Sequence, residues 1–271
     1  MPDADIDRVR VQRSRDVALL NATVREAGEL ALSMFRTDLR RWTKGVSSPV
    51  SEADIAVDEL IRSRLQGATP EYGWLSEESV DDETRLMRDL VWIVDPIDGT
   101  RSFLEHRNDW GVSVALVERG ESIAGAFFAP ATDEFFAAVR GEGATLNGHQ
   151  VMAKSGSDLD FSRMAGPRPL IEKLGLQPDG GATHPRIGSL ALRMCRVAEG
   201  RIDAAFATGN SKDWDLAAAD LIVQEAGGRL TAIGGEALIF NRPSVTHGLL
   251  VAAGRDRHTA IIEYFRNNPS F

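Results

Sequence analysis

A short apolar run that leads directly into closely spaced aspartates constrains this chain more than any other feature of its sequence. Residues Val91–Val94 are continuously apolar, as expected for a strand that is buried on both faces. We expect this strand to end at Asp95-Pro96. Since ligand sites of α/β folds open at the carboxyl ends of strands, Asp95 is predicted to face such a site. Pro96 fixes the turn, which lets Asp98 reach the same side.

The residues at this strand end suit a cation and a phosphate. Two nearby carboxylates, Asp95 and Asp98, match the oxygen ligands that Mg²⁺ prefers. Gly99 would let the backbone approach an anion closely, and Thr100 could orient a water molecule. A helix beginning at Thr100 would direct free N–H groups at a phosphate. The motif by itself therefore favours magnesium-assisted phosphate chemistry.

Two other interpretations fit the same residues. The first is a tight turn in which the aspartates bond only to their own backbone. The second is the signature of haloacid-dehalogenase phosphatases, an apolar strand followed by Asp-x-Asp-Gly-Thr. In this chain two residues separate Asp95 from Asp98, and the motif lies far from the amino terminus, where that family usually begins. The spacing therefore argues against the second interpretation.

The charge balance limits the classes of partner. Forty Asp and Glu residues against 31 Lys and Arg give a formal net charge of −9. A general nucleic-acid binder shows the opposite balance, because neutralisation of phosphates supplies most of its affinity, so no nucleic-acid polymer is expected as a partner. Acidity is compatible with an anionic substrate when carboxylates hold divalent cations, which invert the local charge.

The sequence also predicts a cytoplasmic protein. No run approaches the roughly 20 apolar residues that a membrane span needs, so no membrane association is expected. The first 16 residues lack the apolar stretch of a signal peptide. The single cysteine, Cys195, excludes a disulfide within the chain and fits a reducing compartment.

The hydrophobic pattern predicts a mixed α/β or α+β fold in two parts around a shared cleft. Helices are expected over 16–42, from Ser51 or Asp54 to about residue 65, and over 188–200 and 215–226. Strands are expected over 112–117, 123–128, 135–139 and 249–253. Residues 44–49 are predicted as a loop, and residues 154–181 as a linker or an irregular surface region.

Several separated motifs together resemble the inositol monophosphatase family of lithium-sensitive phosphatases, and the resemblance spans nearly the whole chain. The main signature, Asp-Pro-Ile-Asp-Gly-Thr at 95–100, matches completely. Residues 48–54 resemble the early loop that ends in a catalytic aspartate, here Asp54. Residues 75–79 resemble the Gly-Glu-Glu motif, with Ser76 in place of the glycine, and Trp214-Asp215 with residues 217–218 and 225–228 resembles the second signature.

The resemblance implies a role for each of these residues. Two or three Mg²⁺ ions are implied. Glu77, Asp95 and the Ile97 carbonyl would hold the first ion, Asp95, Asp98 and Asp215 the second, and Glu77 would share a third, weaker one. Asp54 and Thr100, with Glu77, would form the catalytic set that orients and deprotonates the attacking water. The substrate would contact the N–H groups of Gly99 and Thr100, together with Asp98, Asp215, Lys44 and Thr208.

The implied fold is a layered αβαβα sandwich of the inositol monophosphatase and fructose-1,6-bisphosphatase type. Residues 1–153 would form an amino-terminal half with most metal ligands, and residues 154–271 a carboxyl-terminal half that completes the metal and substrate site. The resemblance also implies a homodimer and lithium sensitivity. The implied reaction is hydrolysis of a small soluble phosphate monoester.

The substrate is less constrained than the reaction. Inositol-specific members of the family have a glutamate seven residues before the second-signature aspartate, and this chain has Thr208 there. Loss of that carboxylate, together with the early loop, favours a bacterial 3′(2′),5′-bisphosphate nucleotidase that converts adenosine 3′,5′-bisphosphate to AMP. Inositol 1-phosphate, another sugar phosphate or histidinol phosphate is the alternative. A catalytically silent regulatory relative is a third interpretation, although all the expected carboxylates are present.

Overall fold

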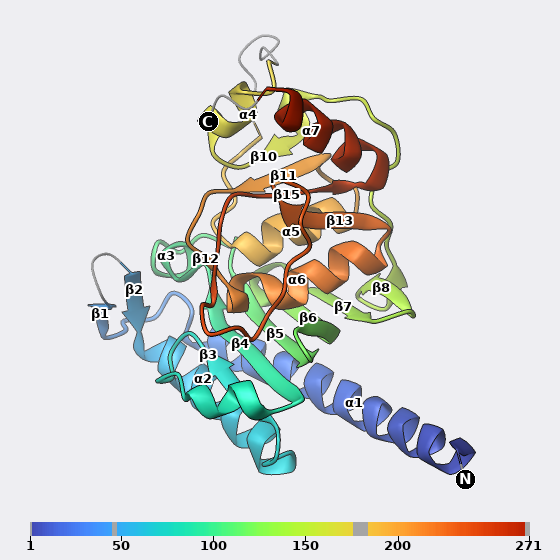
Figure 1. Cartoon of the computed structure of the whole chain (residues 1–271). Helices are drawn as coiled ribbons and strands as arrows, with labels where there is room; N and C mark the ends of the chain where they lie inside the picture. Colours follow the sequence, from blue (N-terminus) through green and yellow to red (C-terminus); the bar gives the residue numbers. More distant parts are fainter. Residues whose placement is uncertain (1, 45–47, 176–183, 269–271) are drawn as a thin grey trace.

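Helices and sheets alternate through the molecule in five layers, in the order α, β, α, β, α (Figure 1). The computed structural model describes residues 2–44, 48–175 and 184–268. The predicted fold class and layer order are confirmed. None of the described helices has the length and apolar character required to cross a membrane.

Helices α1 (Pro2–Met34) and α2 (Glu52–Ala68) form the first layer and pack on one face of a seven-stranded sheet. Strands β3 and β4 of this sheet run parallel, and each later neighbour is antiparallel. The spatial order is β3 (Gly73–Ser76), β4 (Leu90–Asp98), β5 (Gly111–Glu118), β6 (Glu121–Ala129), β7 (Glu134–Val139), β8 (Gly143–Leu146) and β9 (His149–Gln150).

The other three layers are built largely from the second half of the chain. Helices α5 (Leu190–Ala198) and α6 (Asp213–Glu225) lie between the two sheets (Figure 1). The second sheet has the order β10 (Met164–Ala165), β11 (Ala204–Ala207), β15 (Leu250–Gly254) and β13 (Gly228–Ala232). Helices α4 (Arg168–Glu172) and α7 (Arg255–Asn267) form the outer layer.

The remaining elements are short. They are the hairpin β1 (Arg41–Lys44) and β2 (Ser48–Ser51), the pair β12 (Ser211–Lys212) and β14 (Thr246–His247), helix α3 (Thr100–Leu104), and the 3₁₀ turns η1 (Glu83–Met87), η2 (Pro130–Thr132) and η3 (Phe161–Arg163).

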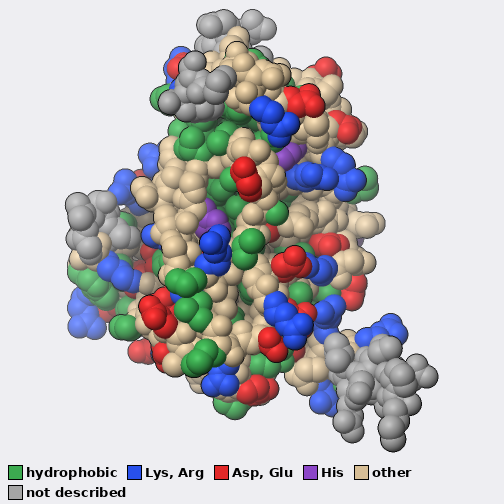
Figure 2. Space-filling view, viewed as in Figure 1, with side chains coloured by type: hydrophobic (Ala, Val, Ile, Leu, Met, Phe, Trp, Pro, Cys, Tyr) green, Lys and Arg blue, Asp and Glu red, His purple; other side chains and the backbone are tan. Residues whose placement is uncertain are grey.

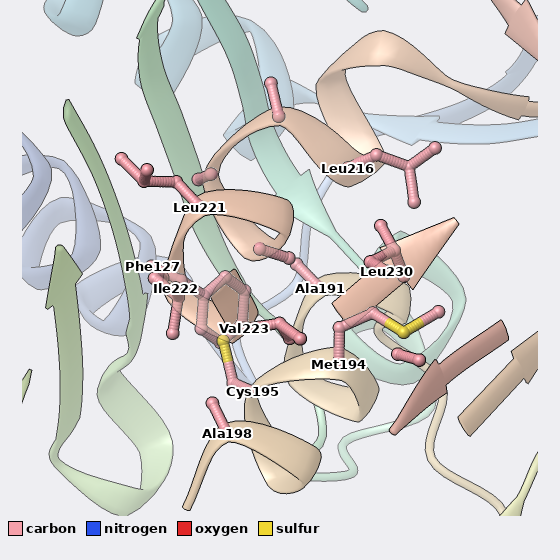
Figure 3. Close-up of a cluster of buried hydrophobic side chains, with 14 of the residues drawn as sticks. Phe127, Ala191, Met194, Cys195, Ala198, Leu216, Leu221, Ile222, Val223 and Leu230 are labelled. Atoms are coloured by element: carbon pink, nitrogen blue, oxygen red, sulfur yellow. The ribbon is translucent and has the colours of Figure 1, made fainter. Parts of the chain in front are cut away.

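Strand β4 is buried on both faces, as its apolar run predicts. Trp92 and Val94 point into the core beneath α1 and α2, whereas Val91 and Ile93 point into the core beneath α5 and α6. Figure 3 shows part of the second core, in which Cys195 packs against side chains from α6. Because neighbouring side chains of a strand point to opposite faces, burial on both sides requires the continuous apolar run seen in the sequence.

Two predicted boundaries are wrong. Strand β4 does not end at Asp95-Pro96 but continues through Asp98, with a bulge against β5 between Asp95 and Asp98. The bulge keeps the chain in the sheet while it redirects the side chains. The helix expected over 16–42 spans Pro2–Met34, because Arg36 adopts a left-handed conformation (φ 63°) and residues 41–44 pair with β2.

The other expected elements are largely confirmed. Ser51 is the N-cap of α2, and the four predicted strands correspond to β5, β6, β7 and β15. The predicted loop over 44–49 is instead a β hairpin at its described residues, and 45–47 lie outside the described residues. The segment 154–181 contains η3, β10 and α4, while residues 176–181 lie outside the description. The boundary after residue 153 falls between β9 and η3 and stays a prediction.

Helix α6 contains a buried carboxyl group, Asp220, that we expect to be largely protonated below about pH 7. Its Oδ2 accepts a hydrogen bond from Gln224 Nε2 (2.8 Å), and its Oδ1 has no partner among the described residues. Burial raises the pKa of Asp220 to about 7. Because the unfolded chain ionises this group near pH 4 and the folded chain does not, the free energy of unfolding falls as the pH rises from about 4 to 7.

Replacement of Asp220 by asparagine should therefore stabilise the protein at pH 8 relative to pH 5. Asparagine keeps the shape of the side chain and cannot ionise. The free energy of unfolding of the variant therefore does not fall at high pH as that of the wild type does. Melting temperatures of both proteins at the two pH values measure the effect, and the exposed Asp38 supplies a control, Asp38→Asn. Equal differences in melting temperature at pH 5 and pH 8 would show that Asp220 is ionised in the folded state.

Candidate active site

Three carboxylates from distant parts of the sequence meet at the end of the large sheet. Glu77, Asp95 and Asp215 each offer one carboxylate oxygen, and these oxygens lie within 4.8 Å of one another. The pairing of β3 with β4 explains the first two, because the parallel register sets Ser76 beside Val94 and Glu77 N donates to Val94 O (3.2 Å). Three of the side chains that the resemblance implies as metal ligands therefore lie together in the structure.

Helix α6 brings in Asp215. Lys212 is the N-cap residue, and Asp215, three residues later, accepts a hydrogen bond from Lys212 N at Oδ2 (2.7 Å). The helix expected over 215–226 therefore begins at Asp213, and Asp215 lies inside its first turn. A carboxylate in this first turn is also favoured by the positive end of the helix dipole.

The cluster is electrostatically strained without a cation. Burial raises the pKa of Asp95 well above its usual range, and the Glu77 and Asp98 carboxylates raise it further. Burial and the Asp215 carboxylate raise the pKa of Glu77 to about 8, while burial and Asp98 raise the pKa of Asp215 to about 7. Like charges that cannot all ionise together become compatible once a divalent cation lies among them. Three hard oxygen donors this close fit such an ion.

Asp98 lies beside the cluster but is held by helix α5. Its Oδ2 accepts hydrogen bonds from the Ser189 hydroxyl (2.5 Å) and Ala191 N (2.6 Å), and its Oδ1 accepts one from Leu190 N (3.1 Å). Ser189 is also the N-cap of α5. Asp98 thus joins the large sheet to a helix of the second half. The sequence predicted a helix over 188–200, with Gly188-Ser189 at its start, but not that the N-terminus of this helix holds Asp98.

Asp54 and Thr100, to which the resemblance assigns the attacking water, form a hydrogen-bonded pair. Thr100 Oγ1 lies 3.1 Å from Asp54 Oδ1 and 3.0 Å from the Ile97 carbonyl, and it can donate to either. Asp54 Oδ2 accepts from Ser51 N (2.7 Å) and the Ser51 hydroxyl (2.6 Å). Asp54 is buried, which raises its pKa, and it lies in the first turn of α2 rather than at the N-cap.

Gly99 is required by the backbone at the start of α3. Its φ is 94°, in the left-handed region, and a Cβ there would lie 3.1 Å from both Asp109 O and Ser189 N. Helix α3 begins at Thr100, as predicted.

Two adjoining cavities open at this site. The smaller one, about 370 Å³, is lined by the predicted residues Glu77, Asp95, Ile97, Asp98, Gly99, Thr100 and Asp215. The larger one, about 720 Å³, is lined by Thr208, Asn210 and Ser211 and by apolar side chains such as Phe161 and Leu190. Asp215 and Arg186 line both cavities, so the two are neighbours. The residues predicted to bind metal and phosphate therefore line a cavity that adjoins a larger one.

Two predicted substrate contacts lie apart from each other. Thr208 lines the larger cavity, and its contact with substrate stays a prediction. Lys44 lies at the other side, where its ammonium donates to the Glu77 carbonyl and lies 3.5 Å from Glu78 Oε2. Lys44 is not among the described residues that line either cavity, so its position favours support of the Glu77 loop over contact with substrate.

Comparison with known proteins agrees with this geometry. The profile of the Inositol monophosphatase family matches residues 13–270. The chain is 33% identical over 250 residues to the Nus factor SuhB of Pasteurella multocida, which covers 87% of this chain and 91% of the relative. It is 34% identical over 248 residues to an inositol-1-monophosphatase of Mesorhizobium japonicum (85% and 91%) and 37% identical over 248 residues to a histidinol-phosphatase of Mycobacterium tuberculosis (87% and 94%).

The fold has solved counterparts. The crystal structure of the extragenic suppressor protein suhB from Bartonella henselae superposes with a TM-score of 0.80 at 28% identity, covering 92% of this chain and 97% of that one. The layered arrangement is therefore shared over nearly the whole chain.

Proposed function

The chain belongs to the inositol monophosphatase family and is a phosphoric monoester hydrolase, and we propose that it uses Mg²⁺ to drive water onto the phosphorus of a small soluble monoester. The observation that carries the proposal is the meeting of Glu77, Asp95 and Asp215 within 4.8 Å at one end of a buried sheet. The family implies a divalent metal, and these carboxylates fit one.

The family resemblance supplies the ligand assignment for these positions. Glu77, Asp95 and the Ile97 carbonyl would hold one ion, and Asp95, Asp98 and Asp215 a second, with Glu77 sharing a third. When bound, the ions supply positive charge that makes water nucleophilic near neutral pH and offsets the charge on the phosphate. Two or three ions would neutralise the acidic cluster as well as the substrate.

The chain's own residues orient the reaction. The Asp54 carboxylate lies within hydrogen-bond distance of the Thr100 hydroxyl, so this pair can hold a water and draw a proton from it toward Asp54. The burial that raises the pKa of Asp54 makes it a better proton acceptor than an exposed aspartate. The backbone N–H groups of Gly99 and Thr100 would bind the phosphate, since both residues line the smaller cavity.

The larger cavity favours a neutral polyol as the leaving group. Thr208, Asn210 and Ser211 offer uncharged donors and acceptors suited to hydroxyls. Among the described residues that line this cavity, Asp215 is the sole carboxylate, so a leaving group with an ammonium, as in histidinol phosphate, would have no separate counter-ion. The name of the Mesorhizobium relative points the same way. We therefore place inositol 1-phosphate first.

A second candidate is a bisphosphate nucleotide. Arg168, Arg186 and Arg193 line the larger cavity, and a second phosphate would suit this positive charge. The sequence alone favoured this substrate, but none of the relatives named above is a nucleotidase by name, whereas two are an inositol and a histidinol phosphatase. The relatives therefore support the alternative better than the nucleotide.

Phosphate release separates these candidates. Rates are measured with Mg²⁺ on inositol 1-phosphate, histidinol phosphate, adenosine 3′,5′-bisphosphate and fructose 1,6-bisphosphate, each with and without lithium. We expect a lithium-sensitive kcat/KM on inositol 1-phosphate that exceeds the others by roughly 10-fold or more, with the Asp95→Asn variant as the background. A dominant rate on the bisphosphate nucleotide would assign the arginines to a second phosphate. No release from any of the four would favour the silent regulatory relative.

Partners other than the substrate stay predictions. A homodimer is expected by resemblance to the family. On the face in view, basic and acidic side chains are interspersed over the surface (Figure 2). That no nucleic-acid polymer binds stays a prediction, and the similarity to a Nus factor SuhB is a reason to test it. Binding of the purified chain to single-stranded RNA at physiological salt tests that expectation.

A further inference from the structure

A buried carboxylate outside both cavities holds the loop that presents Glu77. Asp58 lies on α2, one helical turn after Asp54, with 7% of its surface exposed. Its Oδ1 accepts a hydrogen bond from the Ser76 hydroxyl (2.5 Å), and its Oδ2 accepts one from the Ser79 hydroxyl (2.8 Å). The two serines stand on either side of Glu77 and Glu78. We call residues 76–79 the acidic loop.

Further bonds fix the same loop. The Ser76 hydroxyl also accepts from Glu78 N (3.3 Å), and the Ser79 hydroxyl accepts from Trp74 Nε1 (3.2 Å). Each serine therefore donates to Asp58 while it accepts from the loop or from β3. Because both serine hydroxyls of the acidic loop donate to the Asp58 carboxylate, two hydrogen bonds attach the loop to helix α2.

Burying the Asp58 carboxylate beside other acidic groups costs folding free energy. Asp58 adds a carboxylate to a region that already contains Glu77, Glu78 and Asp54, and its buried oxygens need donors. The two serines supply those donors, and the residue that provides the first, Ser76, stands where the family motif usually has glycine. A glycine could not make this bond. The attachment of the loop to α2 is therefore a feature of this chain's own residues.

We propose that Asp58 is a positioning residue that, through Ser76 and Ser79, fixes Glu77 for metal binding. The inference rests on the proposed magnesium site. Removing a residue that hydrogen-bonds to and orients a metal ligand typically lowers metal affinity by roughly 10- to 100-fold. Asp58 is not among the described residues that line either cavity. We therefore expect its loss to lower magnesium affinity and to change kcat at saturating magnesium much less.

The test is magnesium affinity in Asp58→Ala, Ser76→Ala and Ser79→Ala. We expect the Mg²⁺ concentration for half-maximal activity to rise roughly 10- to 100-fold in Asp58→Ala and less in each serine variant, with kcat at saturating Mg²⁺ within severalfold of wild type. Calorimetric titration with Mg²⁺ alone should show the same order without substrate. Asp58→Asn, which can still accept from one serine and donate to the other, should recover most of the affinity.

Asp16 provides a matched control. It is a buried carboxylate that accepts from two side chains, Gln12 Nε2 (2.9 Å) and Tyr72 Oη (2.9 Å), and it lines neither cavity. Asp16→Ala should lower the melting temperature without shifting magnesium affinity. The inference is overturned if Asp58→Ala binds Mg²⁺ with the same affinity as wild type and Asp16→Ala. If Asp58→Ala does not fold, wild-type affinity in both serine variants overturns it instead. If wild type itself binds no Mg²⁺, the proposed function fails first, and this inference fails with it.

Discussion

Replacing Asp95 with asparagine is expected to abolish phosphate release and leave the fold intact. Asp95 belongs to the three-carboxylate cluster and is the ligand assigned to two ions, so its loss should lower kcat by roughly 10³-fold or more. Asparagine can keep the hydrogen bond that Ile97 N donates to Oδ1 (3.1 Å). The variant therefore removes charge without removing the side chain's local bond.

The same substitution should raise stability when no divalent cation is present. Burial and neighbouring carboxylates raise the pKa of Asp95 well above its usual range, so ionising it at pH 8 costs folding free energy that asparagine does not pay. Melting temperatures in EDTA and in Mg²⁺ measure this effect. Wild type should gain stability from Mg²⁺, by about 2.7 kcal/mol at a concentration 100 times Kd, and Asp95→Asn should gain little.

Two results would contradict this account. Full activity in Asp95→Asn would show that the carboxylate cluster is not the metal site. A wild type whose melting temperature does not respond to Mg²⁺, combined with no release from any ester, would favour the silent regulatory relative.

Local sequence pattern predicted the elements that carry the cluster. The continuous apolar run of β4 reflects burial on both faces, which is a local requirement on each residue of the strand. The turn after it is also local, since Gly99 has the left-handed φ that glycine favours. These features follow from neighbours in the sequence, so a single sequence was enough to predict them.

The clustering of distant residues needed either the resemblance or the structure. Asp215 reaches Asp95 because α6 packs against the large sheet, and no local pattern specifies that contact. The end of α1 at Met34 likewise depends on pairing between β1 and β2, which competes with the helical pattern of residues 35–42. Where a segment has a local preference for helix, pairing with a distant strand can still determine its structure.

Some motif residues are structural. Glu225, within the stretch that resembles the second signature, accepts hydrogen bonds from Gly141 N and Gly143 N (both 2.9 Å). Glu225 therefore holds a contact between α6 and the β7–β8 turn. Thr208, in contrast, lies at the candidate site but does not by itself predict the substrate. The structure places it in the larger cavity, but the identity of the leaving group depends on several lining residues together.

Replacing Asp98 with alanine is expected to lose both activity and stability, in contrast to Asp95→Asn. The Asp98 carboxylate accepts from the Ser189 hydroxyl, Leu190 N and Ala191 N, so alanine leaves donors at the N-terminus of α5 without partners. Unpaired buried donors and a lost connection between the layers should cost roughly 2–5 kcal/mol. For a chain of this size that loss lowers the melting temperature by roughly 4–10 °C.

Ser189→Ala separates the two functions of Asp98. It removes one of the three bonds and the N-cap of α5 but leaves the carboxylate beside the cluster, so it should lower the melting temperature by less than Asp98→Ala and preserve the response to Mg²⁺. Scanning calorimetry and phosphate release on the three proteins measure both effects. An Asp98→Ala variant as stable as wild type would show that α5 is held by other contacts, and the role of Asp98 would then be confined to metal binding.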